Sequence, residues 1–261
     1  MFNAMQIASM EARHAPATDI ALARFHEHAL LLDLNRIDDA LDLLNWCLEV
    51  FKDAQDLRML GNVFGSLAAA EELRGNAGAA LHLEYDALRY SYRAGDVTGI
   101  AVSYQNLGNR FRKESSQPTQ ALAFHLAAAV IRTLTSAEGS SRSVSDAAED
   151  LRQFGPRAVP PTGIEDLSAK IGSIPGTNPA ALIARLSPGP EMAERTLQVL
   201  VTKARNHTAS GNHPVHLTRR RGALIPHIGC LQSSGRRQAT TGEWPGKEIS
   251  CSGRGRLNTG G

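Results

Sequence analysis

The side chains best able to do chemistry are scattered in this chain of 261 residues. His26 and His28 stand two residues apart, which places them about 200° apart around a helix, so they cannot share a metal ion. We therefore expect each of these histidines to face solvent or to be partly packed against other side chains. No phosphate-binding glycine loop, His-Glu-x-x-His or Gly-x-Ser-x-Gly sequence occurs, and no other set of residues indicates catalysis. We therefore expect a protein that is not an enzyme and that holds no cofactor.

Other potential ligands offer little more. His207, His213 and His216 could together hold a metal, but they lie in a stretch that favours disorder. The three cysteines, Cys47, Cys230 and Cys251, form no closely spaced pair and are odd in number, which favours reduced thiols over a disulfide framework. Cys47 is expected to be a small buried residue. His125 is expected to pack against its neighbours.

An internal sequence repeat indicates the helices that would position any site. The pair Ala-Leu follows a short polar break at 40/41, 80/81 and 121/122, in steps of 40 and 41 residues. A small residue follows seven positions later each time, at Cys47, Ala87 and Ala128. Apolar residues recur at helical spacing on both sides of each break. The period predicts an all-α fold, a solenoid of stacked antiparallel helix pairs over residues 18–137.

The same residues resemble the tetratricopeptide repeat (TPR) family, in its long-period form. The third unit shows the pattern most fully, in Tyr104, Leu107-Gly108, Phe111, Ala121 and Ala128. The second unit has Leu67-Ala68, Ala80 and Ala87, and the first has Ala29, Leu32, Ala40 and Cys47. The resemblance implies a right-handed superhelical turn. It covers about half of the chain.

The resemblance also implies where a partner would bind, because the first helix of each TPR pair lines the inner groove. In this chain these positions include Asn62 and Glu72 in the second unit and Gln105, Asn109, Arg112 and Lys113 in the third. The last four form a contiguous polar patch, which we expect to be exposed. Amide and cationic donors on one helix face can hold a carboxylate or the carbonyls of an extended peptide. Ordinary solvated residues are the equally open alternative, and Glu72 argues against a true carboxylate clamp.

The flanking regions differ from the repeats. Residues 1–17 form an N-terminal extension with no continuous apolar run, which predicts neither a signal peptide nor a membrane anchor. Residues 138–205 predict a helical capping region, with helices near 144–154, 164–171, 179–186 and 190–205. Asn178-Pro179 has the form of a helix cap followed by proline at the first helical position. We expect a soluble cytoplasmic protein.

Residues 206–261 form a basic tail rich in glycine, with eight Lys or Arg and two acidic residues. Its net charge is therefore +6, against −4 for the rest of the chain. The composition favours disorder and even resembles unselected coding sequence. Binding of a peptide or protein partner in the repeat groove is the leading hypothesis for function. Nucleic-acid binding through Arg219 to Arg221 and Arg236-Arg237 is the alternative, weakened by the lack of interleaved aromatic residues.

Overall fold

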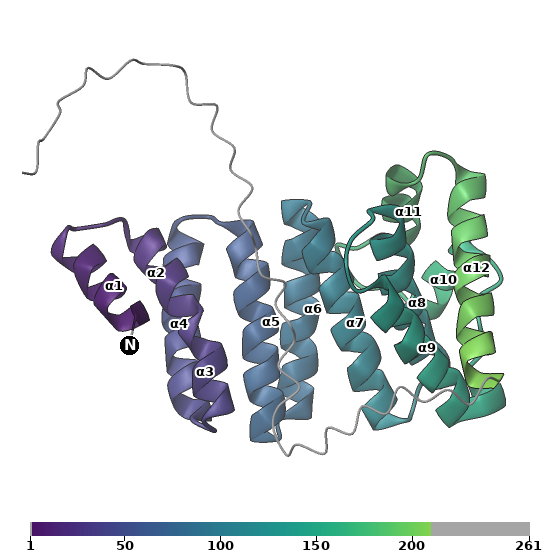
Figure 1. Cartoon of the computed structure of the whole chain (residues 1–261), viewed down its shortest axis with the longest axis horizontal. Helices are drawn as coiled ribbons and strands as arrows, with labels where there is room; N and C mark the ends of the chain where they lie inside the picture. Colours follow the sequence, from purple (N-terminus) through teal and green to yellow (C-terminus); the bar gives the residue numbers. More distant parts are fainter. Residues whose placement is uncertain (1, 210–261) are drawn as a thin grey trace, which may run out of the picture. The chain divides into compact units, whose positions relative to one another are not determined.

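The structure is a computed structural model that describes residues 2–209 of the chain. These residues form helices and connecting turns, with no β-strand among them. The helices follow one another in chain order (Figure 1). Their bounds are α1 Phe2–Ala12, α2 Ala17–Phe25, α3 Glu27–Asp33, α4 Ile37–Asp53, α5 Leu57–Arg74, α6 Ala77–Ala94, α7 Val97–Glu114, α8 Pro118–Leu134, α9 Ser140–Phe154, α10 Ile164–Ile171, α11 Pro179–Leu186 and α12 Pro190–Ala209, with a 3₁₀ turn η1 at Gly155–Arg157. The prediction of an all-α chain of consecutive helix pairs is confirmed.

Short, repeated turns separate the helices of the repeats. Asp56 caps α5 by accepting a bond from the Met59 amide at 3.0 Å, and Asp96 caps α7 through the Gly99 amide at 3.1 Å. The preceding α6 ends at Gly95 in the left-handed region, with φ of 65°. Glycine suits that conformation because it has no Cβ to clash. The two caps stand one repeat apart, so the turn chemistry repeats with the same period as the helices.

Small residues allow the paired helices to approach closely. Ala40, Ala80 and Ala121 are fully buried, as the repeat predicts. Between α5 and α6 the approach is close at Gly61, where an added Cβ would meet the Ser91 hydroxyl at 3.0 Å. Cys47 is also buried, as expected, and burial raises the pKa of its thiol to about 12.

The first unit and the N-terminus depart from the repeat. The first helix of that unit is divided at His26 into α2 and α3. His28 is buried beside Phe25, with its Nδ1 2.5 Å from the Phe25 carbonyl oxygen. Most of the N-terminal extension forms α1, which packs against α2 and which sequence patterns did not indicate.

Helix α8 is the most deeply buried element. Its residues from Ala121 to Ile131 are all inaccessible to solvent. Besides α7 and α9, it contacts α10, α11 and α12. Apolar residues of these later helices, among them Leu167, Ile183 and Leu197, belong to the same core. Residues 164–209 therefore cover the last repeat on several sides.

The helices expected after the repeats are present close to their predicted bounds. Asn178 accepts a bond from the Ala181 amide at 2.9 Å, which confirms the predicted cap of α11. Helix α12 extends to Ala209, four residues past the expected end at Arg205. The remainder of the basic tail, residues 210–261, lies outside the described residues. The predictions of disorder, of reduced thiols at Cys230 and Cys251, and of binding by the arginine clusters concern that part of the chain.

Candidate functional site

The residues expected to bind a partner lie on α5 and α7, but their environments differ. The Lys113 side chain is 53% exposed, while that of Glu72 is 29% exposed. Asn62 and Asn109 are partly buried. Gln105 is buried, and only 17% of the Arg112 side chain is exposed. The prediction that Gln105 and Arg112 belong to an exposed patch is therefore wrong, because both reach toward α9.

Ion pairs join the first helix of the second unit, α5, to that of the third, α7. Glu72 on α5 accepts bonds from both Arg110 and Lys113 on α7. Glu72 and Lys113 are 41 residues apart, which is one repeat. Glu72 is thus the partner of two basic residues on α7, Arg110 and Lys113. A carboxylate entering from a ligand would have to compete with it, which agrees with the expectation that no true carboxylate clamp forms.

Behind this pair lies a buried glutamate on α6. Glu84 has no exposed surface, and its carboxylate accepts bonds from Asn106 at 3.2 and 3.3 Å and faces Arg110 at 3.5 Å. Burial raises the pKa of Glu84 to about 7, against the opposing effects of Arg110, Asn106 and the Ser103 hydroxyl. A carboxyl group that changes protonation near neutral pH therefore lies where α6 and α7 meet.

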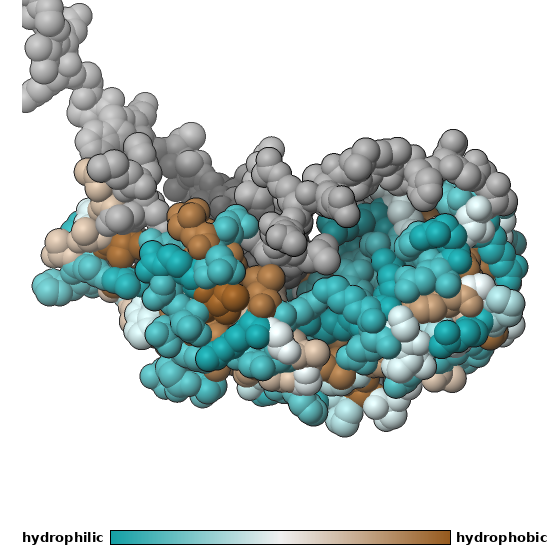
Figure 2. Space-filling model, turned by 90° about the horizontal axis from the view of Figure 1, so that it is seen from below, coloured by the Kyte–Doolittle hydropathy of each residue, from teal (hydrophilic) through white to brown (hydrophobic). Residues whose placement is uncertain are grey.

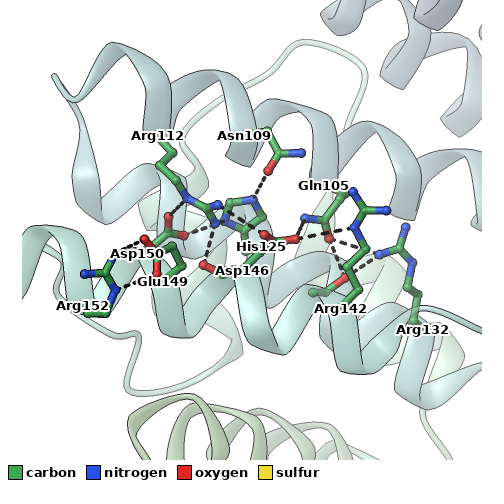
Figure 3. A network of polar contacts seen from close by, with 11 residues as sticks. Gln105, Asn109, Arg112, His125, Arg132, Arg142, Asp146, Glu149, Asp150 and Arg152 are labelled. Carbon is green, nitrogen blue, oxygen red and sulfur yellow. Dashed lines mark hydrogen bonds and ion pairs between the residues drawn. The ribbon is translucent and has the colours of Figure 1, made fainter. Parts of the chain in front are cut away.

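A second set of bonds joins α7 to α9 (Figure 3). Arg112 donates to the Asp150 carboxylate, lies 3.2 Å from Asp146 Oδ1 and donates to the Asp146 carbonyl at 2.6 Å. Burial opposes the charge of Arg112, but Asp150 and Asp146 outweigh it and raise the pKa of the guanidinium group. Gln105 adds a bond of 2.7 Å to Asp146, again 41 residues away. Polar side chains one repeat apart therefore hold successive first helices together.

His125 on α8 lies at the centre of this set. Its ring is buried and makes polar contacts. Its Nδ1 lies 2.5 Å from Asp150 Oδ2, and its Nε2 lies 3.1 Å from Asn109 Oδ1 (Figure 3). A Cβ added at Gly108 would lie 2.5 Å from Nε2, so glycine leaves room for the ring. Arg112 Nη2 also lies 3.1 Å from Nδ1. The expectation that His125 only packs against its neighbours is wrong, because three hydrophilic partners surround its ring.

The pairing of His125 with Asp150 has the form of a base oriented by a carboxylate. Both side chains are, however, fully buried. A general base must come within hydrogen-bond reach of the proton that it removes, and a substrate cannot reach these atoms without opening the helix pair. The arrangement therefore stabilises the contact of α7, α8 and α9.

Sequence reasoning missed Asp146, Asp150 and Arg132 as members of this network. The signal that could have revealed the two aspartates is opposite charge or complementary polarity about one repeat apart on the predicted first helices. Arg112 and Asp150 are 38 residues apart, as are Arg110 and Glu72. The same spacing in two successive units indicates contacts between equivalent helical turns.

The surface differs along the chain (Figure 2). In this view apolar side chains gather over the N-terminal helices, and the region of α7 to α9 is mostly hydrophilic. Several large apolar residues of the N-terminal region are exposed, namely Met5, Leu22, Leu30, Leu34 and Trp46.

Within residues 2–209, no three His, Cys, Asp or Glu side chains come close enough to hold a metal ion together. The helices of that range include none with the length and apolarity needed to cross a membrane. Comparison with family models, curated proteins and solved structures finds no match to the chain.

Proposed function

We propose that this chain is a non-catalytic scaffold that binds a peptide segment or a protein partner across its successive first helices, α5, α7 and α9. The observation that supports this most directly is the series of bonds between these helices, from Glu72 to Lys113 and from Arg112 to Asp150. These bonds fix polar side chains in place before a partner arrives. Binding to a fixed surface involves a smaller loss of side-chain freedom.

The accessible groups on this face suit an extended peptide. The Oδ1 atom of Asn109 lies against His125, and its amide nitrogen points away from the ring (Figure 3). That nitrogen can donate to a backbone carbonyl. Lys113, which is more than half exposed, and Asn62, which is partly buried, supply further donors on α7 and α5.

The proposal includes a TPR-like identity for the repeats, a right-handed superhelical turn and a capping role for the helices after α9. Its support is the equivalent burial of Ala40, Ala80 and Ala121, the equivalent caps Asp56 and Asp96, and the covering of α8 by later helices. A cytoplasmic location stays a prediction. Nucleic-acid binding also stays a prediction, since the arginine clusters behind it lie outside the described residues.

The choice of test variant follows from the contacts. Replacing Arg112 by Glu would place a third acid beside Asp146 and Asp150, so this change would disturb folding. Lys113→Glu changes an exposed side chain instead. We expect full-length Lys113→Glu to lose the specific partner that the wild-type protein captures from native extract, because complementary charge governs recognition.

Lys203→Glu, on the exposed side of α12, is the matched control and should keep that partner. Far-ultraviolet circular dichroism should show equal helical content in the three proteins. Capture that is unchanged in Lys113→Glu, or lost equally in Lys203→Glu, would remove the first-helix face from consideration as the binding surface.

A further inference from the structure

Two arginines lie at the corner where α8 ends and α9 begins. Arg132, in the last turn of α8, uses Nη1 to contact Gln105 Oε1 at 3.1 Å and the Ser143 hydroxyl. Both acceptors are neutral. Within residues 2–209, no carboxylate lies within the 4.0 Å of an ion pair with Arg132. Burial, followed by the nearby charge of Arg142, lowers the pKa of Arg132.

The two aspartates of α9 near this corner are engaged mainly by Arg112, and Glu138 of the α8–α9 loop is exposed. Asp146 lies 3.2 Å from Arg112 and only 4.0 Å from Arg142, and it acts on Arg132 from a greater distance. Asp150 is bound to Arg112 and to the histidine of α8. Neither Arg132 nor Arg142 has a carboxylate of the described residues closer than 4.0 Å. Their like charges repel each other.

The free donors of these groups are suited to an anion. An arginine carries five N–H donors in a planar fork, and the two bonds of Arg132 both use Nη1. The Arg142 side chain is 54% exposed, so its donors can be reached from solvent. Figure 3 shows both side chains at the same end of the polar network, beside Gln105. Guanidinium forks bind carboxylates in pairs of parallel hydrogen bonds.

We propose that Arg132 and Arg142 form a receptor corner for the acidic side chains of a protein partner. The proposal rests on the proposed function and specifies its partner, an acidic segment that runs past the α8–α9 corner. An aspartate or glutamate of that segment bonds to both guanidinium groups and offsets the repulsion between them. The corner is separate from Lys113 and Asn62, so the two surfaces can be tested independently.

The test measures binding of a fluorescent hexaglutamate peptide, with blocked ends, to the full-length protein by fluorescence anisotropy. Arg142→Gln and Arg132→Gln should each weaken binding by about fivefold or more, as expected for the loss of charged hydrogen bonds. Arg152→Gln is the matched control, because Arg152 is also on α9, is 55% exposed and is already paired with Glu149. It should change affinity by less than about twofold.

Basic residues of the tail could also attract the peptide. All proteins in the comparison therefore carry glutamine at the five tail arginines, Arg219, Arg220, Arg221, Arg236 and Arg237. A hexaglutamine peptide tests for charge and should not bind. Arg142→Gln is decisive if Arg132→Gln alters the circular dichroism spectrum, because the Arg142 side chain is exposed.

The two proposals fail in different ways. No hexaglutamate binding, equal binding of hexaglutamine, or equal losses in Arg142→Gln and Arg152→Gln would overturn the receptor corner, whatever Lys113→Glu does to capture. Suppose that peptide binding depends on Arg132 and Arg142, while Lys113→Glu leaves partner capture unchanged. That result would support the receptor corner and overturn the proposal that the partner binds the face around α5 and α7.

Discussion

The buried carboxyl group of Glu84 makes stability depend on pH in a direction that can be worked out. Its pKa is about 7 in the folded protein, against an ordinary value of 4.5. Below pH 4.5 the group is protonated in both states and has no effect. Between these values the unfolded chain releases the proton and the folded chain keeps it, so the free energy of unfolding falls as pH rises. Above pH 7 the loss is complete.

The size of the loss follows from the same values. A rise in pKa from 4.5 to about 7 corresponds to about 3 kcal/mol, at about 1.4 kcal/mol per pKa unit. Glu84→Gln removes the titration and keeps a side chain of similar shape. Its absolute stability also reflects altered bonds to Arg110 and Asn106. The informative quantity is therefore the difference in free energy of unfolding between variant and wild type, which should shift in favour of the variant by about 3 kcal/mol between about pH 4.5 and 8.

Urea unfolding followed by circular dichroism at about pH 4.5, 6 and 8 measures this difference. Other titrating groups, such as His28, affect both proteins alike and cancel. Glu49→Gln is the control, because the Glu49 side chain is 69% exposed and pairs with Lys52 on the same helix. A Glu84→Gln difference that stays constant over this pH range, or that matches the Glu49→Gln difference, would refute the reasoning.

Three further predictions concern packing and reactivity. Gly108→Ala should destabilise the protein by about 1–3 kcal/mol in urea unfolding, because the new Cβ would overlap a histidine ring at 2.5 Å. Gly65→Ala, whose Cβ would have its nearest neighbour at 3.9 Å, should instead be neutral or stabilising by up to about 1 kcal/mol. Ala121→Leu should cost about 1–3 kcal/mol by overpacking, whereas Ala79→Leu on an exposed position should stay within about 0.5 kcal/mol; equal effects would contradict the assigned repeat register. Cys47 should resist iodoacetamide in the native protein and react after unfolding, as peptide mass spectrometry would show, since burial holds its thiol protonated; labelling at equal rates in both states would contradict its burial.

The sequence by itself determined the local structure of the repeats. Apolar residues at helical spacing, polar breaks and small residues at equivalent positions are local patterns, and each helix from α4 to α9 lies where they predict. The cap at Asn178 is also local, because the side chain that caps a helix stands next to it in the chain. The exceptions have local reasons as well: α1 has no strong apolar periodicity to reveal it, and the break at His26 has neither glycine nor proline to mark it.

Tertiary structure alone decided which polar side chains are free. Gln105 and Lys113 stand on one predicted helix, yet the first is buried against α9 and the second is largely exposed. The exposure of each side chain depends on which residues of the neighbouring helices pack against it, and those residues are about 40 positions away in the sequence. For the same reason the sequence did not distinguish a histidine packed among apolar residues from His125 bound to Asp150. A helical pattern fixes the direction of a side chain from its own axis, whereas its partners depend on how three helices meet in space.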